Sequence, residues 1–244
     1  MKTRKLTVSI LLRSIICNCY FYMAVGFFII FILAPLSLLK SPKPMRKAIL
    51  IYCKSVLYVF EKIGKIKIEE RGVENIPRDK AMIYCSKHMS NLDALILFRQ
   101  SPNLTALAKA EIYKVPFLNM VLNKMGVLAI KRGAGEAQKQ TPELAKFIFD
   151  NKLPMIIFAE GTRTLIGERR PIKSGAFYYQ QEEDIDIIVV AHNSGFYWPR
   201  KSMIKWPGTI IVEYFPSMAK GLSKEDFMAE VERRLMDRSE ELIL

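Results

Sequence analysis

Histidine and cysteine are scarce in this chain of 244 residues. It has two histidines, His88 and His192, and four cysteines, at positions 17, 19, 53 and 85. Because no C-x-x-C or Cys/His spacing is present, the sequence predicts no metal site, and nothing in it requires an oxidising compartment. The G-x-S-x-G elbow of serine hydrolases is also absent. With metal and serine-hydrolase chemistry set aside, the two histidines are the first candidates for proton transfer.

Acidic residues are almost missing from the N-terminal part. Residues 1–67 contain 12 Lys and Arg and a single acid, Glu61, for a net charge of +11, whereas residues 68–244 carry only +2. The same region contains 26 uncharged residues, 14–39, more than the ~20 that a membrane-crossing helix needs. Since the basic excess surrounds an apolar run and the rest is nearly neutral, we expect a membrane partner and no nucleic acid.

Basic residues flank this apolar run on both sides, at residues 2–5 and 40–47. The run exceeds the ~7–15 residues of a signal-peptide core, and no small-residue cleavage site follows it. A shorter apolar stretch, residues 49–60, looks interfacial. We predict that residues 1–64 form a membrane hairpin or anchor with both basic flanks on the cytoplasmic face, and a single span is the alternative. The predicted location is a membrane, the cytoplasmic membrane in a bacterium, with the domain that follows residue 64 facing the cytoplasm.

Short apolar runs alternate with helical patterns beyond residue 65. Strand-like runs occupy residues 65–70, 81–85, 127–131, 154–158, 185–191 and 209–214. Helices are expected over residues 92–100, 116–125, 142–151 and 224–242, the last as a solvated cover. With 50% hydrophobic residues the chain can bury one substantial core. We predict an α/β fold over residues 65–244, a layered sheet with flanking helices, preceded by N-terminal membrane helices.

His88 stands five residues ahead of Asp93, directly after the strand predicted at residues 81–85. A histidine can take a proton from a hydroxyl, and a carboxylate beside it can fix its tautomer and stabilise the imidazolium. The alternative is structural, because Ser90 and Asp93 also fit the S-x-x-D capping box of the next helix. The two interpretations are compatible, since a capped helix would hold His88 rigidly at a strand-to-helix junction.

Polar residues follow three other predicted strands. Arg132 ends the run at residues 126–132, and its planar guanidinium suits phosphate, although such a charge is more often a solvated strand end. The loop Glu160-Gly161-Thr162-Arg163 follows the strand predicted at residues 154–158. Its glycine lets backbone N–H groups approach a ligand, which favours a binding loop. The alternative to a binding loop is a salt-bridged turn between Glu160 and Arg163. His192 has no carboxylate nearby in the sequence, so we expect a hydrogen-bonded or packed histidine.

Taken in order, these stretches resemble the 1-acyl-sn-glycerol-3-phosphate acyltransferase family, also called lysophosphatidic acid acyltransferases, over residues 71–216. His88 and Asp93 match its H-x4-D motif. Residues 109–116 match K-x-E-L-x-x-x-P with Ile112 for leucine, and residues 126–132 match G-x-I-x-x-x-R with Leu128 for isoleucine. Residues 158–164 match F-x-E-G-T-R-S with Thr164 for serine. Residues 173–176 match K-x-G-A. In the fourth motif, residues 189–195, Val189 replaces proline, which bears on acyl or acceptor preference more than on activity.

The resemblance implies transfer of a fatty acyl group from acyl-CoA or acyl carrier protein to the sn-2 hydroxyl of 1-acyl-glycerol-3-phosphate, which gives phosphatidic acid. It implies His88 as general base, Asp93 as the group that orients its ring, and no resident cofactor. The substrate-binding residues that it implies are Lys109, Arg132, Glu160, Gly161, Thr162 and Arg163. The implied partners are membrane lipids, lysophosphatidic acid and the acyl donor.

Other functions stay open at this point. Another lysolipid or glycerol 3-phosphate is an alternative acceptor within the same chemistry. A non-catalytic module that binds anionic membranes would use the basic N-terminal block, but it leaves the polar strand ends unexplained. A serine hydrolase would use Ser90 or Ser194 as nucleophile, with His88 as its base.

Overall fold

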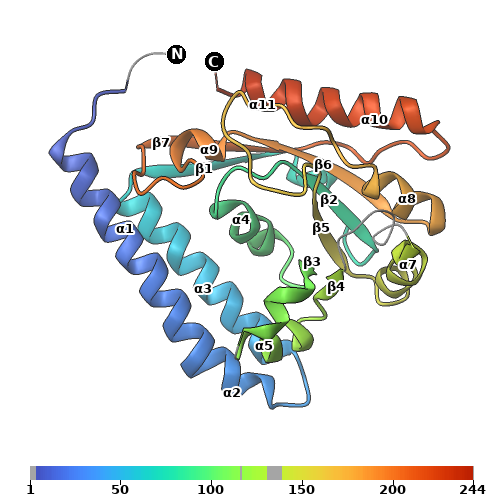
Figure 1. The fold of residues 1–244 in the computed structure, drawn as a ribbon, viewed down its shortest axis with the longest axis horizontal. Coiled ribbons are helices and arrows are strands. Elements are labelled where there is room, and N and C mark those ends of the chain that lie inside the picture. The colour runs from blue at the N-terminus through green and yellow to red at the C-terminus, as the bar shows by residue number, and fades with distance from the viewer. Residues whose placement is uncertain (1–3, 116, 131–138, 244) are drawn as a thin grey trace.

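Seven strands in the described part of the chain form one mixed sheet (Figure 1). The computed structural model describes residues 4–115, 117–130 and 139–243. The strands are β1 (Ile66–Arg71), β2 (Met82–Ser86), β3 (Thr105–Lys109), β4 (Leu128–Ile130), β5 (Pro154–Phe158), β6 (Asp186–His192) and β7 (Gly208–Tyr214). Their order is β1-β7-β6-β2-β5-β3-β4, and these neighbours pair in parallel except β6 with β7. The predicted layered α/β fold is confirmed.

Helices connect the strands and cover the sheet on both faces (Figure 1). They are α1 (Val8–Phe27), the π-helical η1 (Phe28–Leu33), α2 (Ala34–Ser37), α3 (Lys43–Lys62), α4 (Leu92–Gln100), α5 (Leu118–Lys124), α7 (Thr141–Asp150), α8 (Gly175–Glu182), α9 (Ser194–Tyr197), α10 (Lys224–Glu232), the π-helical η4 (Arg233–Asp237) and α11 (Arg238–Glu241). Two short 3-10 helices are η2 (Val73–Asn75) and η3 (Ala110–Lys114). The C-terminal helix predicted over residues 224–242 is thus one helical run with a π-helical middle.

Side chains of β2 alternate between the two faces of the sheet, as the two-residue period of a strand requires. Met82 and Tyr84 belong to a buried cluster with residues of α3 and α4, whereas Ile83 and Cys85 belong to one with residues of α7, α8 and α10. β6 divides in the same way. Because both of their faces are covered, these central strands appear in the sequence as continuous apolar runs.

Residues 4–62 form an N-terminal arm along one side of the sheet. Among the described residues, one helix, Val8–Ser37, is long and apolar enough to cross a membrane by length and composition. α3 returns beside it (Figure 1). Cys17 of α1 and Phe60 of α3 lie in the same buried cluster as Tyr84 of the sheet. The predicted domain boundary near residue 65 falls in the short link between α3 and β1.

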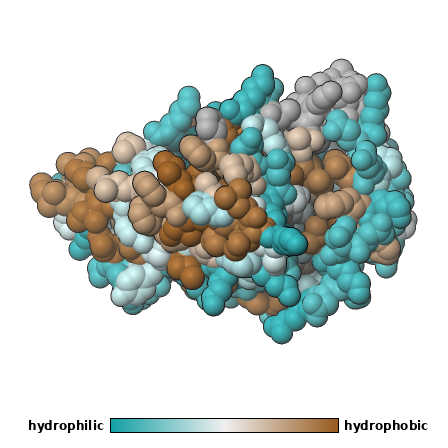
Figure 2. All heavy atoms as spheres, turned by 90° about the horizontal axis from the view of Figure 1, so that it is seen from below, coloured by the Kyte–Doolittle hydropathy of each residue, from teal (hydrophilic) through white to brown (hydrophobic). Residues whose placement is uncertain are grey.

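The outer face of the arm is apolar and unpacked. Its exposed large side chains are Leu6, Val8, Leu11, Leu12, Ile15, Ile16, Tyr22, Met23, Phe27, Ile30, Phe31, Leu38, Leu39, Ile51 and Tyr58. Figure 2 shows an apolar surface at the end of the molecule that the N-terminal helices form. A contiguous exposed apolar surface of this kind is typical of an interaction site.

Candidate active site

The carboxyl ends of β2, β5 and β6 meet at one edge of the sheet. The register pairs Ser86 with Phe158 on one side and with Val190 on the other. The loops that leave these three strands therefore lie together, and they carry the predicted His88, the Glu160–Arg163 stretch and His192. This is the edge at which α/β proteins commonly bind ligands.

His88 and Asp93 form a hydrogen-bonded pair, with 3.0 Å between Nδ1 of the ring and Oδ2 of the carboxylate. The Asp93 side chain is fully buried, whereas the His88 side chain is 22% exposed. Because an ionised carboxylate can only accept, Nδ1 of the ring donates to it, and in the neutral ring Nε2 then carries the lone pair. The pair thus has the arrangement of a general base with its orienting acid.

The same carboxylate also caps α4. Asp93 Oδ2 accepts from the backbone N–H groups of Met89 at 2.8 Å and Ser90 at 2.9 Å, and the Ser90 hydroxyl accepts from the Leu92 N–H at 3.3 Å. Burial acts to raise the pKa of Asp93, but the charge of His192 and the hydrogen bonds from His88 and Ser194 bring that pKa below its usual value. The capping box and the His88 pair therefore occupy the same residues.

Phe158 and Glu160 fix the position of His88 from the β5 side. The rings of His88 and Phe158 stack with centroids 3.7 Å apart and planes 14° apart. Glu160 Oε2 accepts from the His88 N–H at 3.1 Å, and Oε1 accepts from the Thr164 hydroxyl at 3.0 Å. Burial raises the pKa of Glu160 above its usual value. Glu160 thus joins the loop after β5 to the loop after β2. The sequence motif, which points to substrate binding, does not reveal this contact.

A cavity of about 610 Å³ opens beside His88. Its polar lining includes Thr162, Arg163 and Lys173, and its apolar lining includes Leu107, Ile112 and the β5 residues Ile156, Ile157 and Phe158. The cavity therefore offers cationic groups for a phosphate and an apolar wall for a hydrocarbon chain, next to the histidine.

Lys173 is a site residue that the sequence prediction did not include. Gly161 has a φ of +69°, and a Cβ added there would lie 2.6 Å from Lys173 Nζ. The lysine thus lies across the glycine and lines the cavity with Arg163. The K-x-G-A match at residues 173–176 was the available signal. The Gly161 N–H donates to the Phe158 carbonyl at 2.9 Å, so it stabilises the turn.

The other predicted basic residues differ in their placement. Arg163 donates to the Asn91 side-chain carbonyl, so the salt-bridged turn with Glu160 is not the arrangement adopted. Lys109 ends β3, where it pairs in register with Ile130 of β4. Arg132 lies outside the described residues. Downstream, Arg169 pairs with Asp237 and Glu240 of the C-terminal helical run, at 2.8 Å each.

His192 is buried and hydrogen-bonded, as predicted. Its Nε2 lies 2.9 Å from the Lys87 carbonyl and its Nδ1 lies 3.1 Å from the Ser194 hydroxyl. Ser194 donates to Asp93 Oδ1 at 2.5 Å, so a carboxylate does lie near His192 in space. Because the Ser194 hydroxyl is held by Asp93 and both Ser194 and Ser90 are 1% exposed, the geometry does not fit a serine nucleophile.

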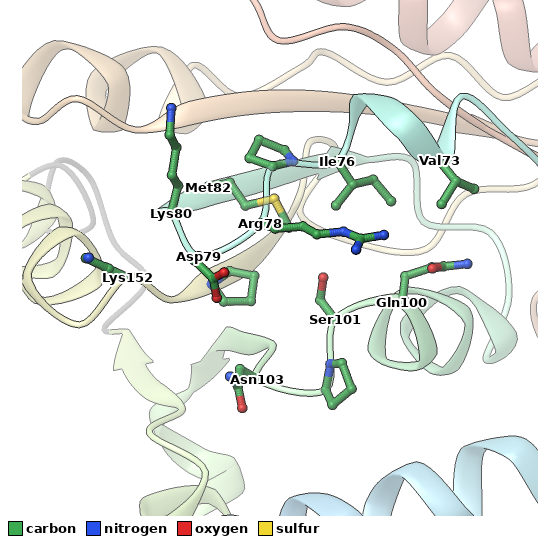
Figure 3. A pocket seen from close by; sticks show the side chains of 13 residues that line it. Val73, Ile76, Arg78, Asp79, Lys80, Met82, Gln100, Ser101, Asn103 and Lys152 are labelled. Carbon is green, nitrogen blue, oxygen red and sulfur yellow. The ribbon is translucent and has the colours of Figure 1, made fainter.

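A second cavity, of about 330 Å³, lies at the opposite ends of the strands. It is lined by Met82 and Pro154, the first residues of β2 and β5, and by Arg78, Lys80 and Lys152 (Figure 3). It contains none of the predicted site residues. The His88 cavity is therefore the candidate active site.

Residues 67–193 match the family model described as Acyltransferase. The chain belongs to the acyltransferase family. It is 30% identical over 168 residues to the 1-acyl-sn-glycerol-3-phosphate acyltransferase of Pseudomonas aeruginosa, a match that covers 68% of this chain and 65% of that protein. It is 27% identical over 169 residues to 1-acyl-sn-glycerol-3-phosphate acyltransferase alpha of Mus musculus, over 67% of this chain and 59% of that protein. The chain therefore spans less than two thirds of either relative in these matches.

The fold of this family member also matches a solved structure. The 1-acyl-sn-glycerophosphate (LPA) acyltransferase PlsC from Thermotoga maritima superposes with a TM-score of 0.76 over 95% of this chain and 97% of that one, at 21% identity. The resemblance drawn from the ordered motifs is thus confirmed by the family model and by the relatives, and the fold by the structure.

Proposed function

We propose that the chain transfers a fatty acyl group from a thioester donor to the sn-2 hydroxyl of 1-acyl-glycerol-3-phosphate, with His88 as the general base. The observation that carries this proposal is the His88–Asp93 pair at a cavity with both cationic and apolar lining. The relatives from Pseudomonas aeruginosa and Mus musculus are named for the same activity. The donor, acyl-CoA or acyl carrier protein, is a substrate.

The proposed reaction needs one proton acceptor and no covalent enzyme intermediate. Nε2 of His88 takes the proton of the acceptor hydroxyl as that oxygen attacks the thioester carbonyl carbon. When the tetrahedral intermediate collapses, the C–S bond breaks and the leaving thiolate takes the proton from the imidazolium. Asp93 stabilises that imidazolium through Nδ1. General base catalysis of this kind contributes about 10²- to 10⁴-fold.

The acceptor phosphate would be bound by the cations of the same cavity. Arg163 and Lys173 both line it, and an arginine fork and a lysine point charge are the common protein ligands of phosphate. Lys109 and Arg132 stay predicted phosphate ligands on the family motif. The apolar wall formed by β5 and Ile112 would take a hydrocarbon chain.

The N-terminal arm would hold the enzyme on the bilayer that contains its acceptor and product. Hydrogen bonds join the arm to the rest of the chain at both ends, from Arg4 to the Phe196 carbonyl and from Lys124 to the Lys40 carbonyl. In the middle, Asn18 donates to the Met203 carbonyl at 2.7 Å. A helix attached along its length presents one apolar face to lipid. This attachment favours a hairpin that lies in the membrane interface, and it disfavours a single membrane-crossing span.

The deciding experiment is acyl transfer by the purified protein in lipid, with two donors, acyl-CoA and acyl carrier protein thioester, crossed with several acceptors. We expect labelled phosphatidic acid from lysophosphatidic acid, and less product from glycerol 3-phosphate or lysolipids without the phosphomonoester. His88→Ala should abolish transfer and leave vesicle binding unchanged.

Two outcomes would contradict the proposal. Transfer at the wild-type rate by His88→Ala would remove the base from the mechanism. Vesicle binding without transfer for any donor and acceptor would instead favour the non-catalytic membrane module that the basic N-terminal block also fits.

A further inference from the structure

The carboxylate of Asp93 is held from two opposite sides. Oδ2 accepts from His88 and from the N–H groups of Met89 and Ser90, all within the loop after β2. Oδ1 accepts from the Ser194 hydroxyl at 2.5 Å; Ser194 is the first residue of α9, just after β6 and 101 residues further along the chain. Ser194 in turn contacts His192, and His192 reaches back to the Lys87 carbonyl. The contacts form a closed chain around the catalytic pair.

The hydrogens of this chain can be assigned from its acceptors. Ser194 has one hydroxyl proton, and it donates that proton to Asp93. Its oxygen can then only accept from His192 Nδ1. The Lys87 carbonyl can also only accept, so His192 Nε2 must donate to it. The geometry therefore calls for donation from both ring nitrogens, because a neutral ring would leave one nitrogen lone pair against an oxygen lone pair.

We propose that Ser194 and a positively charged His192 are positioning residues, which keep the Asp93 carboxylate ionised and oriented toward His88. This inference deepens the proposed function and rests on it. An ionised carboxylate without solvent contact is costly unless opposite charge and donors compensate it. His192, one hydroxyl away and 3% exposed, provides that charge in the same dry environment.

Two further observations agree with this assignment. A positive charge on His192 would lower the pKa of Asp93 more than any other neighbouring group does, against the opposing effect of burial. Gly195 follows Ser194 without space for a side chain, since a Cβ there would lie 2.7 Å from the Met89 Cβ. The close packing of the two loops sets the distance across which Ser194 reaches Asp93.

Kinetics of Ser194→Ala, Ser194→Thr and His192→Gln test the positioning role. We expect Ser194→Ala and His192→Gln to lower kcat about 10- to 100-fold with little change in KM, the effect of losing a hydrogen bond to a charged group. Ser194→Thr keeps the hydroxyl and should recover most of the rate. Ser217→Ala is the matched control, because that hydroxyl also donates to an aspartate, Asp186, 3.2 Å away at the other end of β6; its kcat should equal that of the wild type.

Nuclear magnetic resonance of ¹⁵N-histidine gives a readout that does not depend on activity. The chain has only two histidines, so His192→Gln assigns both sets of ring signals. We expect His192 to be protonated on both nitrogens at pH 7.5, where a solvated histidine is mostly neutral, and His88 to be protonated on Nδ1 alone. A neutral His192 in the wild type, or wild-type kcat in both Ser194→Ala and His192→Gln, would overturn the inference. Full activity of His88→Ala would instead overturn the proposed function, whatever the state of His192.

Discussion

Asp93→Asn separates the two tasks of one side chain, because the carboxylate both orients His88 and caps α4. The carboxylate accepts four hydrogen bonds, three on Oδ2 and one on Oδ1. Asparagine offers one oxygen and one amide group. If its oxygen keeps the three donors on the His88 side, the helix cap survives, but the negative charge that stabilises the His88 imidazolium is lost.

The expected loss follows from this loss of charge. General base catalysis contributes about 10²- to 10⁴-fold, so kcat should fall in that range, equivalent to about 3 to 5 kcal/mol of transition-state stabilisation. The cost in stability should be smaller, about 1 to 3 kcal/mol for an altered hydrogen bond to a buried group. Acyl transfer kinetics and thermal unfolding of the same preparation measure the two quantities.

Asp226→Asn is the matched control. Asp226 also stands three residues after a capping serine, Ser223, whose hydroxyl donates to Asp226 Oδ2 at 2.8 Å and accepts from its N–H at 3.0 Å. Asp226 is exposed on α10, so its replacement should lower stability slightly and leave kcat unchanged. If Asp93→Asn lowers the unfolding temperature yet keeps kcat close to that of the wild type, Asp93 is only a cap and the catalytic reasoning is wrong.

Three other predictions concern the loop, the arm and its attachment. Gly161→Ala and Gly126→Ala place alanine at the same φ of +69°, so each variant should lose about 1 to 2 kcal/mol of stability. Only Gly161→Ala should also raise KM for the acceptor, because its Cβ meets Lys173. Equal KM values in the two variants would contradict the role of Lys173. Burial lowers the pKa of Lys205 to about 7 in the folded protein, whereas an unfolded lysine has a pKa near 10.4. Between these two pH values the unfolded state binds more protons, so the stability of the fold, measured as the unfolding temperature, should rise from pH 7 to pH 10. Lys205→Met should remove this rise. Phe31 of η1 is 66% exposed on the arm, and Phe149 of α7 is 39% exposed away from it. Phe31→Glu should weaken vesicle binding, measured by flotation, and Phe149→Glu should not. Equal binding by the two variants would show that this face of the arm does not contact the membrane.

The strands that were predicted from the sequence are those with the most consistent local signals. β2, β5 and β6 are apolar runs bounded by polar loops, and the residues that follow them carry the candidate site. β3 was missed because its sequence, Thr-Ala-Leu-Ala-Lys, contains mainly good helix formers and is held as a strand by its neighbours β4 and β5. α8 was missed because it begins at Gly175 and contains three aromatic residues, so its helical state depends on packing against α7 and α10.

Individual hydrogen bonds within the site were predictable only where they join residues close in sequence. His88 and Asp93 are five residues apart, and their spacing at a strand end was enough. Ser194 reaches Asp93 from 101 residues away, and no periodicity or spacing reports a hydrogen bond of that kind. Glu160 was assigned to substrate from its motif, but its carboxylate binds the His88 N–H, a contact that depends on the register of β2 with β5.

The shared core of the arm and the sheet limits how a water-soluble form can be made. Deleting residues 4–62 would remove Cys17, Met45 and Phe60 from the cluster that contains Tyr84 and Val190, and one face of the sheet would then be exposed to water. Replacing only the outward apolar side chains of α1, such as Met23 and Phe27, would leave that cluster intact. Solubilisation by surface redesign should therefore yield a folded protein where truncation yields an aggregate.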